Sequence, residues 1–133
     1  MKKLEHFRAN LASLEKAYEQ DLTNPFIISG IVEQFAIQFE LGWKLLRELA
    51  ACDGAPKMNT GSPRGVIKEA FLLFDFLDGD LWLEMLSDTD RHLSLYDQAA
   101  QEKVARRVLD DYIVALRVLA REAEKQNADR AAG

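Results

Sequence analysis

The sequence predicts an all-α protein, an up-and-down antiparallel four-helix bundle with one additional short helix. Two observations predict this class. Apolar residues recur every three or four positions in successive stretches, which is the spacing of one helix face, and no stretch alternates apolar and polar residues as a half-buried strand does. A chain of 133 residues suits one domain with a substantial core. We therefore expect a single domain over residues 1–133, in which the small and polar residues 126–133 fray.

The longest predicted helix spans residues 24–53 and forms the spine of the fold. Asn24 can accept the capping hydrogen bond, Pro25 suits the first turn, and Gly54 is expected to end the helix. Its apolar residues alternate by four and three along one face: Ile28, Val32, Phe35, Phe39, Gly42, Leu46 and Leu49. That face is widened by three residues spaced seven apart: Ala36, Trp43 and Ala50.

The other helices follow from the same spacing. The first is expected from Leu4 to Tyr18, and a third begins at the cap Ser62 and continues through Leu77. Asp78-Gly79-Asp80 separates it from a short helix around Trp82. Residues 87–96 have no clear period, and Asp97 is expected to cap the last helix. The predicted core comprises Phe7, Leu11, Leu14, Phe35, Phe39, Leu46, Phe71, Phe74, Leu109, Tyr112 and Leu116.

Composition and charge exclude several classes of protein. A net charge of -5 argues against a general nucleic-acid coat, because binding phosphate backbones needs clustered basic residues. Charged residues interrupt even the 24–53 helix, so it is not expected to span a membrane. Met1-Lys2-Lys3 does not begin a signal peptide, and we expect a cytoplasmic protein. The single Cys52 is expected in the core rather than as a reactive thiol.

No metal or cofactor site is predicted. The acidic residues around Gly79 do not have the spacing of a calcium loop, so helix stop and cap explains them better. One Cys and two distant His cannot supply a zinc site, and there is no glycine-rich phosphate loop. Arg64 and Lys68 lie near a helix start, where basic residues oppose the helix dipole, and they weakly indicate an anion or an acidic partner. The alternative is a solvated surface.

The candidate binding surface is the polar segment from Asp88 to Asp97. It collects charged, hydroxyl and aromatic side chains in one connection, although a solvated connection is an equal alternative. Arg91 could engage a phosphate or carboxylate, with His92 and Ser94 donating hydrogen bonds and Tyr96 offering a stacking face. Asp88 and Asp90 could belong to this surface or could cap backbone N–H groups. Arg64 and Lys68 are possible neighbours.

Three runs of sequence carry a resemblance to a known family: QFAIQFELGWKLL from Gln34, SPRGVIKEAF from Ser62, and LWLEMLSD from Leu81. With Tyr96-Asp97 at the same distance from Trp82, they resemble the nucleotidyltransferase substrate-binding proteins, within the HEPN superfamily of helical bundles. The resemblance covers nearly the whole chain. It implies a bundle that commonly dimerises and that acts beside a separately encoded minimal nucleotidyltransferase, which holds the metal and transfers the nucleotide.

At residues 88–97 the sequence departs from the pattern of this family, and the difference has chemical consequences. Relatives usually read D-R-N-x-x-S-H-T-Y-D, and related HEPN proteins use an Arg and a later His as a toxin's ribonuclease site. Here Thr89 stands where Arg is usual, Asp90 where Asn is usual, and Ser94 where His is usual. RNA cleavage by such a pair needs a proton carrier near neutral pH and a fixed cation, which Thr89 and Ser94 cannot supply.

We therefore expect a non-catalytic substrate-binding or partner subunit, related to toxin–antitoxin systems, with a nucleotidyltransferase as partner and a nucleotide or another anionic substrate as ligand. The alternatives are a HEPN-type ribonuclease, which the missing Arg–His pair disfavours, and a plain helical interaction protein. A symmetric homodimer is also expected, because the apolar faces exceed what one small bundle covers. The alternative is that the short helix around Trp82 covers the excess.

Overall fold

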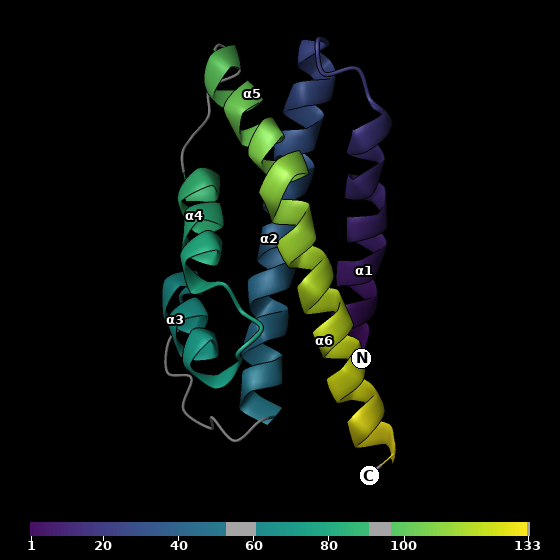
Figure 1. The fold of residues 1–133 in the computed structure, drawn as a ribbon, viewed down its shortest axis with the longest axis vertical. Coiled ribbons are helices and arrows are strands. Elements are labelled where there is room, and N and C mark those ends of the chain that lie inside the picture. Colours follow the sequence, from purple (N-terminus) through teal and green to yellow (C-terminus); the bar gives the residue numbers. More distant parts are fainter. Residues whose placement is uncertain (53–60, 91–96, 133) are drawn as a thin grey trace.

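The computed structural model describes residues 1–52, 61–90 and 97–132, and these form an all-α bundle, as predicted. The elements in chain order are α1 (Lys2–Glu15), a 3-10 turn (Lys16–Glu19), α2 (Pro25–Cys52), α3 (Pro63–Leu73), α4 (Gly79–Asp90), α5 (Gln98–Arg107), a π-turn (Val108–Tyr112) and α6 (Ile113–Ala132). No strand occurs within these residues. The α5, π and α6 segments follow one another without a break and form the last long leg of the bundle (Figure 1).

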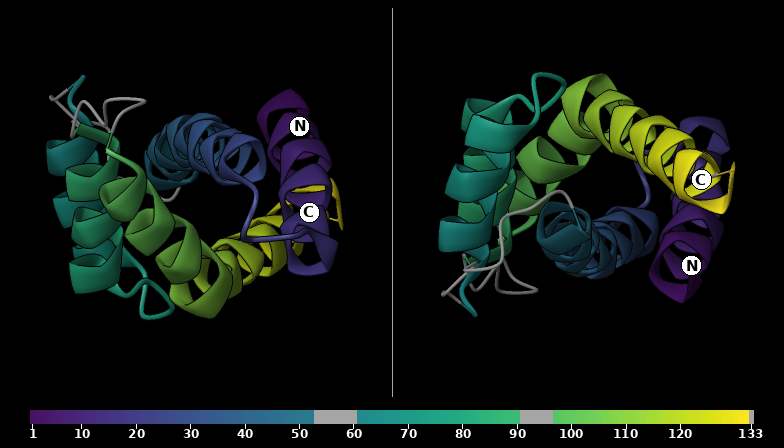
Figure 2. Two further views of the ribbon diagram at one scale, coloured as in Figure 1. Left: turned by 90° about the horizontal axis from the view of Figure 1, so that it is seen from above. Right: turned by 90° about the horizontal axis from the view of Figure 1, so that it is seen from below.

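Helix α2 is the centre of the bundle, and every other α-helix contacts it. Viewed along its axis, α2 lies between the α3–α4 side and α1, with α5 and α6 along a third side (Figure 2). The predicted core residues of α2, Phe35, Phe39 and Leu46, are all buried. The short helix α4 covers part of its wide apolar face, because the buried Trp82 ring lies 6.0 Å from the ring of Phe39. Helix α4 therefore contributes to covering this face, and the homodimer and its alternative both stay predictions.

Polar contacts fix the directions of the long helices. Lys3 pairs with Glu48 at 3.4 Å and Asn10 bonds Gln38 at 2.5 Å, so α1 and α2 run antiparallel. Gln38 is fully buried and donates to the carbonyl oxygen of Phe7 at 3.0 Å, which satisfies its amide inside the core.

The last leg is oriented by its own contacts. Arg8 pairs with Glu124, and Arg117 pairs with Glu15, both at 2.5 Å, so α6 is antiparallel to α1. Helices α5 and α6 consequently run in the same direction as α2, which is the up-and-down arrangement that the sequence predicts.

The predicted caps are confirmed. Asn24 accepts a hydrogen bond from the backbone N–H of Phe26 at 2.9 Å, and Ser62 accepts one from Gly65 at 3.2 Å. Asp97 accepts one from Ala100 at 3.1 Å. Each bond joins residues two or three positions apart, so the local sequence is sufficient to specify it. Gly54, the expected stop of α2, lies outside the described residues.

Several expected boundaries are wrong. α1 ends at Glu15 and α3 at Leu73, before the expected ends at Tyr18 and Leu77. Residues 16–19 form a 3-10 turn instead, and the Tyr18 hydroxyl donates to the carbonyl oxygen of Leu109 at 2.6 Å, which leaves its ring half exposed. The final helix continues to Ala132, and the fraying expected from residue 126 stays a prediction.

Three burial predictions also need correction. Phe71 is 55% exposed, because it lies across the start of α4 rather than inside the bundle. Leu109 is only half buried. Cys52 is exposed, because it is the last residue of α2 and follows the final buried residues of that helix, Leu49 and Ala50. The remaining predicted core residues are buried.

Candidate functional site

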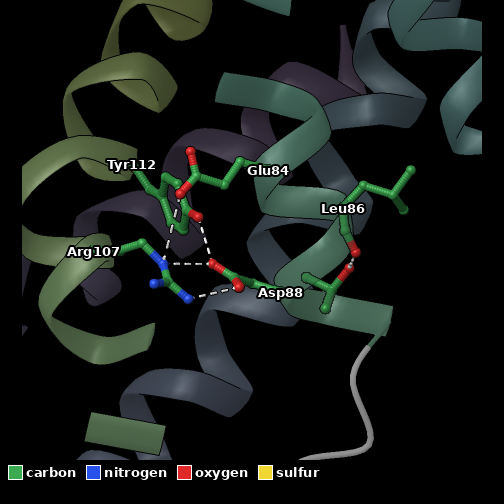
Figure 3. A network of polar contacts seen from close by, with 6 residues as sticks. Glu84, Leu86, Asp88, Arg107 and Tyr112 are labelled. Atoms are coloured by element: carbon green, nitrogen blue, oxygen red, sulfur yellow. Dashed lines mark hydrogen bonds and ion pairs between the residues drawn. The ribbon is translucent and has the colours of Figure 1, made fainter. Parts of the chain in front are cut away.

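The main polar network of the described residues joins α4 to the last leg of the bundle (Figure 3). Asp88 accepts two hydrogen bonds from Arg107, from Nε to Oδ2 at 2.9 Å and from Nη2 to Oδ1 at 2.8 Å. The Tyr112 hydroxyl donates a third bond to Oδ2. Glu84, one turn earlier on α4, lies 3.9 Å from Arg107 Nε. Both carboxylate oxygens of Asp88 are therefore engaged inside the protein.

The helix geometry explains how Arg107 and Tyr112 reach the same carboxylate. Residues five apart on a regular α-helix point about 140° away from each other. The π-turn over Val108–Tyr112 takes on an extra residue, which brings positions five apart toward one face. Val108 and Tyr112 are both fully buried, and the Tyr112 ring stacks on Phe35 with centroids 5.0 Å apart. Packing against α2 thus fixes the ring whose hydroxyl holds Asp88.

The electrostatics of this network favour a structural role. The hydrogen bond to Asp88 raises the pKa of Arg107 above its ordinary value, so the guanidinium stays positively charged. Burial, followed by the hydrogen bond to Asp88, raises the pKa of Tyr112 well above its ordinary value of 10.0, so the phenol stays protonated. Neither group gains or loses a proton near neutral pH. The network can hold α4 on the last leg, and neither Arg107 nor Tyr112 suits the role of a proton carrier at physiological pH.

The structure divides the predicted site residues into groups. Asp88 and Asp90 belong to the last turn of α4, which corrects the expectation of an irregular segment from residue 87. Asp88 is buried, and among the described residues its carboxylate binds Arg107 and Tyr112 rather than backbone N–H groups, whereas Asp90 is exposed. A second group lies outside the described residues: Arg91, His92, Ser94 and Tyr96.

The remaining predicted site residues, Arg64 and Lys68, lie on the exposed side of α3. Neither makes an ion pair with any residue that the structure describes. Lys68 borders a surface cavity of about 270 Å³ between α3 and α4, whose opposite wall includes Asp80. The positive charges of Arg64 and Lys68 are compatible with an anionic ligand or an acidic partner. Binding of such a ligand or partner stays a prediction.

Sequence reasoning missed Arg107 as the partner of Asp88. The available signal was its place three residues after the buried Val104 and next to the buried Val108, a position where a charged side chain needs a partner. Tyr112 was predicted to be buried, but not to bond Asp88. The π-turn, which aligns the two, has no recognisable signature in the sequence.

Among the acidic residues around Gly79, Asp78 caps a helix start, as predicted. Asp78 Oδ1 accepts a hydrogen bond from the backbone N–H of Leu81 at 3.1 Å. Within residues 1–52, 61–90 and 97–132, no group of three or more His, Cys, Asp or Glu side chains is arranged to hold a metal ion. In the same ranges, no helix combines the length and the apolar character that crossing a membrane requires.

The fold and this network define a small helical-bundle protein whose α4 is clamped to its final leg. Residues 2–125 match the family described as "Nucleotidyltransferase substrate binding protein like". Because this match covers most of the chain, the protein belongs to that family, and the resemblance carried by the three sequence runs is confirmed. No curated protein matches the sequence.

Proposed function

We propose that this protein is a non-catalytic substrate-binding or partner subunit of a two-component nucleotidyltransferase system. The observation that carries the proposal is the family match over residues 2–125. In this proposal the separate nucleotidyltransferase chain holds the metal and transfers the nucleotide. The helical bundle presents the substrate or docks to the enzyme, in the cytoplasm and as a homodimer.

The geometry around residues 91–96 supports a binding surface there. On one side, Arg107 and Tyr112 hold Asp88, three residues before Arg91. On the other side, Asp97 caps α5 through the N–H of Ala100. The segment therefore connects two helices, α4 and α5, whose adjoining ends are defined by these contacts.

The side chains proposed to bind are those whose chemistry suits an anion. Arg91 would pair with phosphate or carboxylate oxygens through its planar guanidinium. His92 and Ser94 would donate hydrogen bonds, and Tyr96 would stack on a base or donate through its hydroxyl. Asp88 would act as a positioning residue rather than contact the ligand, because its carboxylate is already bound to Arg107 and Tyr112.

The test first searches the neighbouring reading frames for a small nucleotidyltransferase with a G-S-x-A-x-G and D-x-D pattern, and then co-expresses it with this protein. We expect the two proteins to co-purify. The double variant Arg91→Ala/His92→Ala should weaken binding to the enzyme or to nucleotides, while the control Arg121→Ala, an exposed residue of α6, should not. Unchanged affinities in a folded double variant would refute the site. Failure to form a complex at all would favour a plain helical interaction protein, and cleavage of RNA would favour the ribonuclease.

A further inference from the structure

Helices α3 and α4 lie at one edge of the bundle (Figure 2), and α3 exposes large apolar side chains there. Leu72 is 82% exposed, and Phe71 before it and Leu73 after it are also exposed. Leu72 borders the cavity of about 270 Å³ between the two helices, whose apolar wall also includes Ile67 and Leu83. Single exposed apolar residues are ordinary in proteins, but Phe71 and Leu72 both border an apolar cavity, and such a combination marks an interaction surface.

Phe71 is held in place on this surface. A Cβ atom added to Gly79, the first residue of α4, would lie 2.8 Å from Cδ1 and 3.0 Å from Cγ of the Phe71 ring. The ring therefore rests against the Gly79 backbone, where any side chain would displace it. A rigid aromatic residue that is exposed on its outer side can contact a partner with little loss of conformational freedom.

The charges around the cavity identify the partner. Lys68 stands on the α3 wall and Asp80 on the α4 wall, and neither makes an ion pair with a described residue. A twofold axis that runs along the groove between α3 and α4 would place each wall of one copy against the opposite wall of the other. Lys68 of each copy would then face Asp80 of its mate, and Leu72 of each would enter the other's cavity. This surface is self-complementary, as an interface between identical subunits must be.

We propose that Phe71, Leu72 and the α3–α4 cavity form the surface through which two copies of this chain associate about a twofold axis. This inference rests on the homodimer that is part of the proposed function, and it adds the surface and its geometry. It does not depend on the nucleotidyltransferase, whose binding is measured separately by co-purification.

The first experiment compares two changes from an exposed apolar residue to an acidic one, with the molar mass measured by light scattering and the dissociation constant by sedimentation. Leu72→Asp should raise the dissociation constant of the dimer by roughly 30-fold or more, as expected for a central apolar contact. Phe26→Asp is the matched control, because Phe26 is 86% exposed but lies at the start of α2. It should leave the dimer unchanged.

The second experiment uses charge reversal. Lys68→Glu alone and Asp80→Lys alone each create two like-charge contacts across the twofold axis, and each should weaken the dimer at least about tenfold. Mixing the two variants should restore association, because both contacts of the mixed dimer then join opposite charges. Lys103→Glu, at an exposed position of α5, is the control and should have no effect.

Three results would overturn the inference. A wild-type protein that stays monomeric at micromolar concentration would refute both the homodimer and this surface. A dimer that Leu72→Asp does not weaken would refute the surface alone, and a dimer that only Phe26→Asp weakens would place the interface at the start of α2. Charge-reversal variants that do not recover on mixing would refute the twofold pairing of Lys68 with Asp80. Circular dichroism of each variant verifies that the helical fold is retained.

Discussion

Two glycines of α2 allow the packing of the central helix to be tested with one chemical change. Gly30 is exposed, and a Cβ added there meets nothing within 4 Å. Gly42 is buried, and a Cβ there would lie 2.9 Å from Cη2 of Trp82 and 3.2 Å from Cε2 of Phe7. Replacing either glycine by alanine improves helix propensity equally. Any difference between the two variants therefore reports the tertiary contacts.

The magnitudes follow from these contacts. Gly30→Ala should stabilise the protein by about 0.5–1 kcal/mol, because it lowers the conformational freedom of the unfolded chain without a clash. At Gly42 the same gain is opposed by overpacking, which costs about 1–3 kcal/mol when neighbouring side chains must shift. Trp82 and Phe7 are buried and cannot move into solvent. Gly42→Ala should therefore destabilise the protein, by about 1 kcal/mol net.

The assay is urea denaturation followed by the helical circular dichroism signal, with the slope of the transition compared among variants. We expect the midpoint to rise for Gly30→Ala and to fall for Gly42→Ala, with unchanged slopes. Replacing Trp82 by Phe removes the ring atoms nearest Gly42, so the loss from Gly42→Ala should be smaller in that background. If both alanine variants are stabilised equally, the close contact of Gly42 with Trp82 is refuted.

Two further predictions concern the network around Asp88. Asp88→Ala should destabilise the protein by about 2–4 kcal/mol in urea denaturation, because it leaves Arg107 and the buried Tyr112 hydroxyl without their acceptor, whereas Glu84→Gln should cost less than about 1 kcal/mol. Equal losses in the two variants would contradict the central place of Asp88. The pKa of Tyr112 is raised in the folded state, so the phenol of the unfolded chain loses its proton at a lower pH than the phenol of the folded chain. The free energy of unfolding should therefore fall above about pH 10, by at most about 1.4 kcal/mol per pH unit. The Tyr112→Phe variant should lack this part of the loss of stability at high pH. If the free energy of unfolding depends on pH in the same way in both proteins, the protonated, buried phenol is refuted.

The sequence by itself determined the helices and the ways in which they begin. Asn24, Ser62 and Asp97 were each predicted as caps, and each bonds a backbone N–H two or three residues later. Such contacts depend only on neighbouring residues, so tertiary structure is not needed to predict them. The spacing of apolar residues likewise identified the all-α class and most of the core, because a helix buries the side on which those residues lie.

Only the tertiary structure decided what covers each helix and where polar groups meet. Phe71 and Phe74 lie on neighbouring parts of one predicted stripe, yet Phe74 is buried and Phe71 is exposed, because α3 ends at Leu73 and α4 packs beside it. The contacts of the candidate site were likewise decided by the tertiary structure. The sequence located the polar region from Asp88 onward, but the bond from Asp88 to Arg107 joins residues 19 apart in the chain. The register of such a contact is set by how two helices pack and by a π-turn, and neither is encoded in a local spacing.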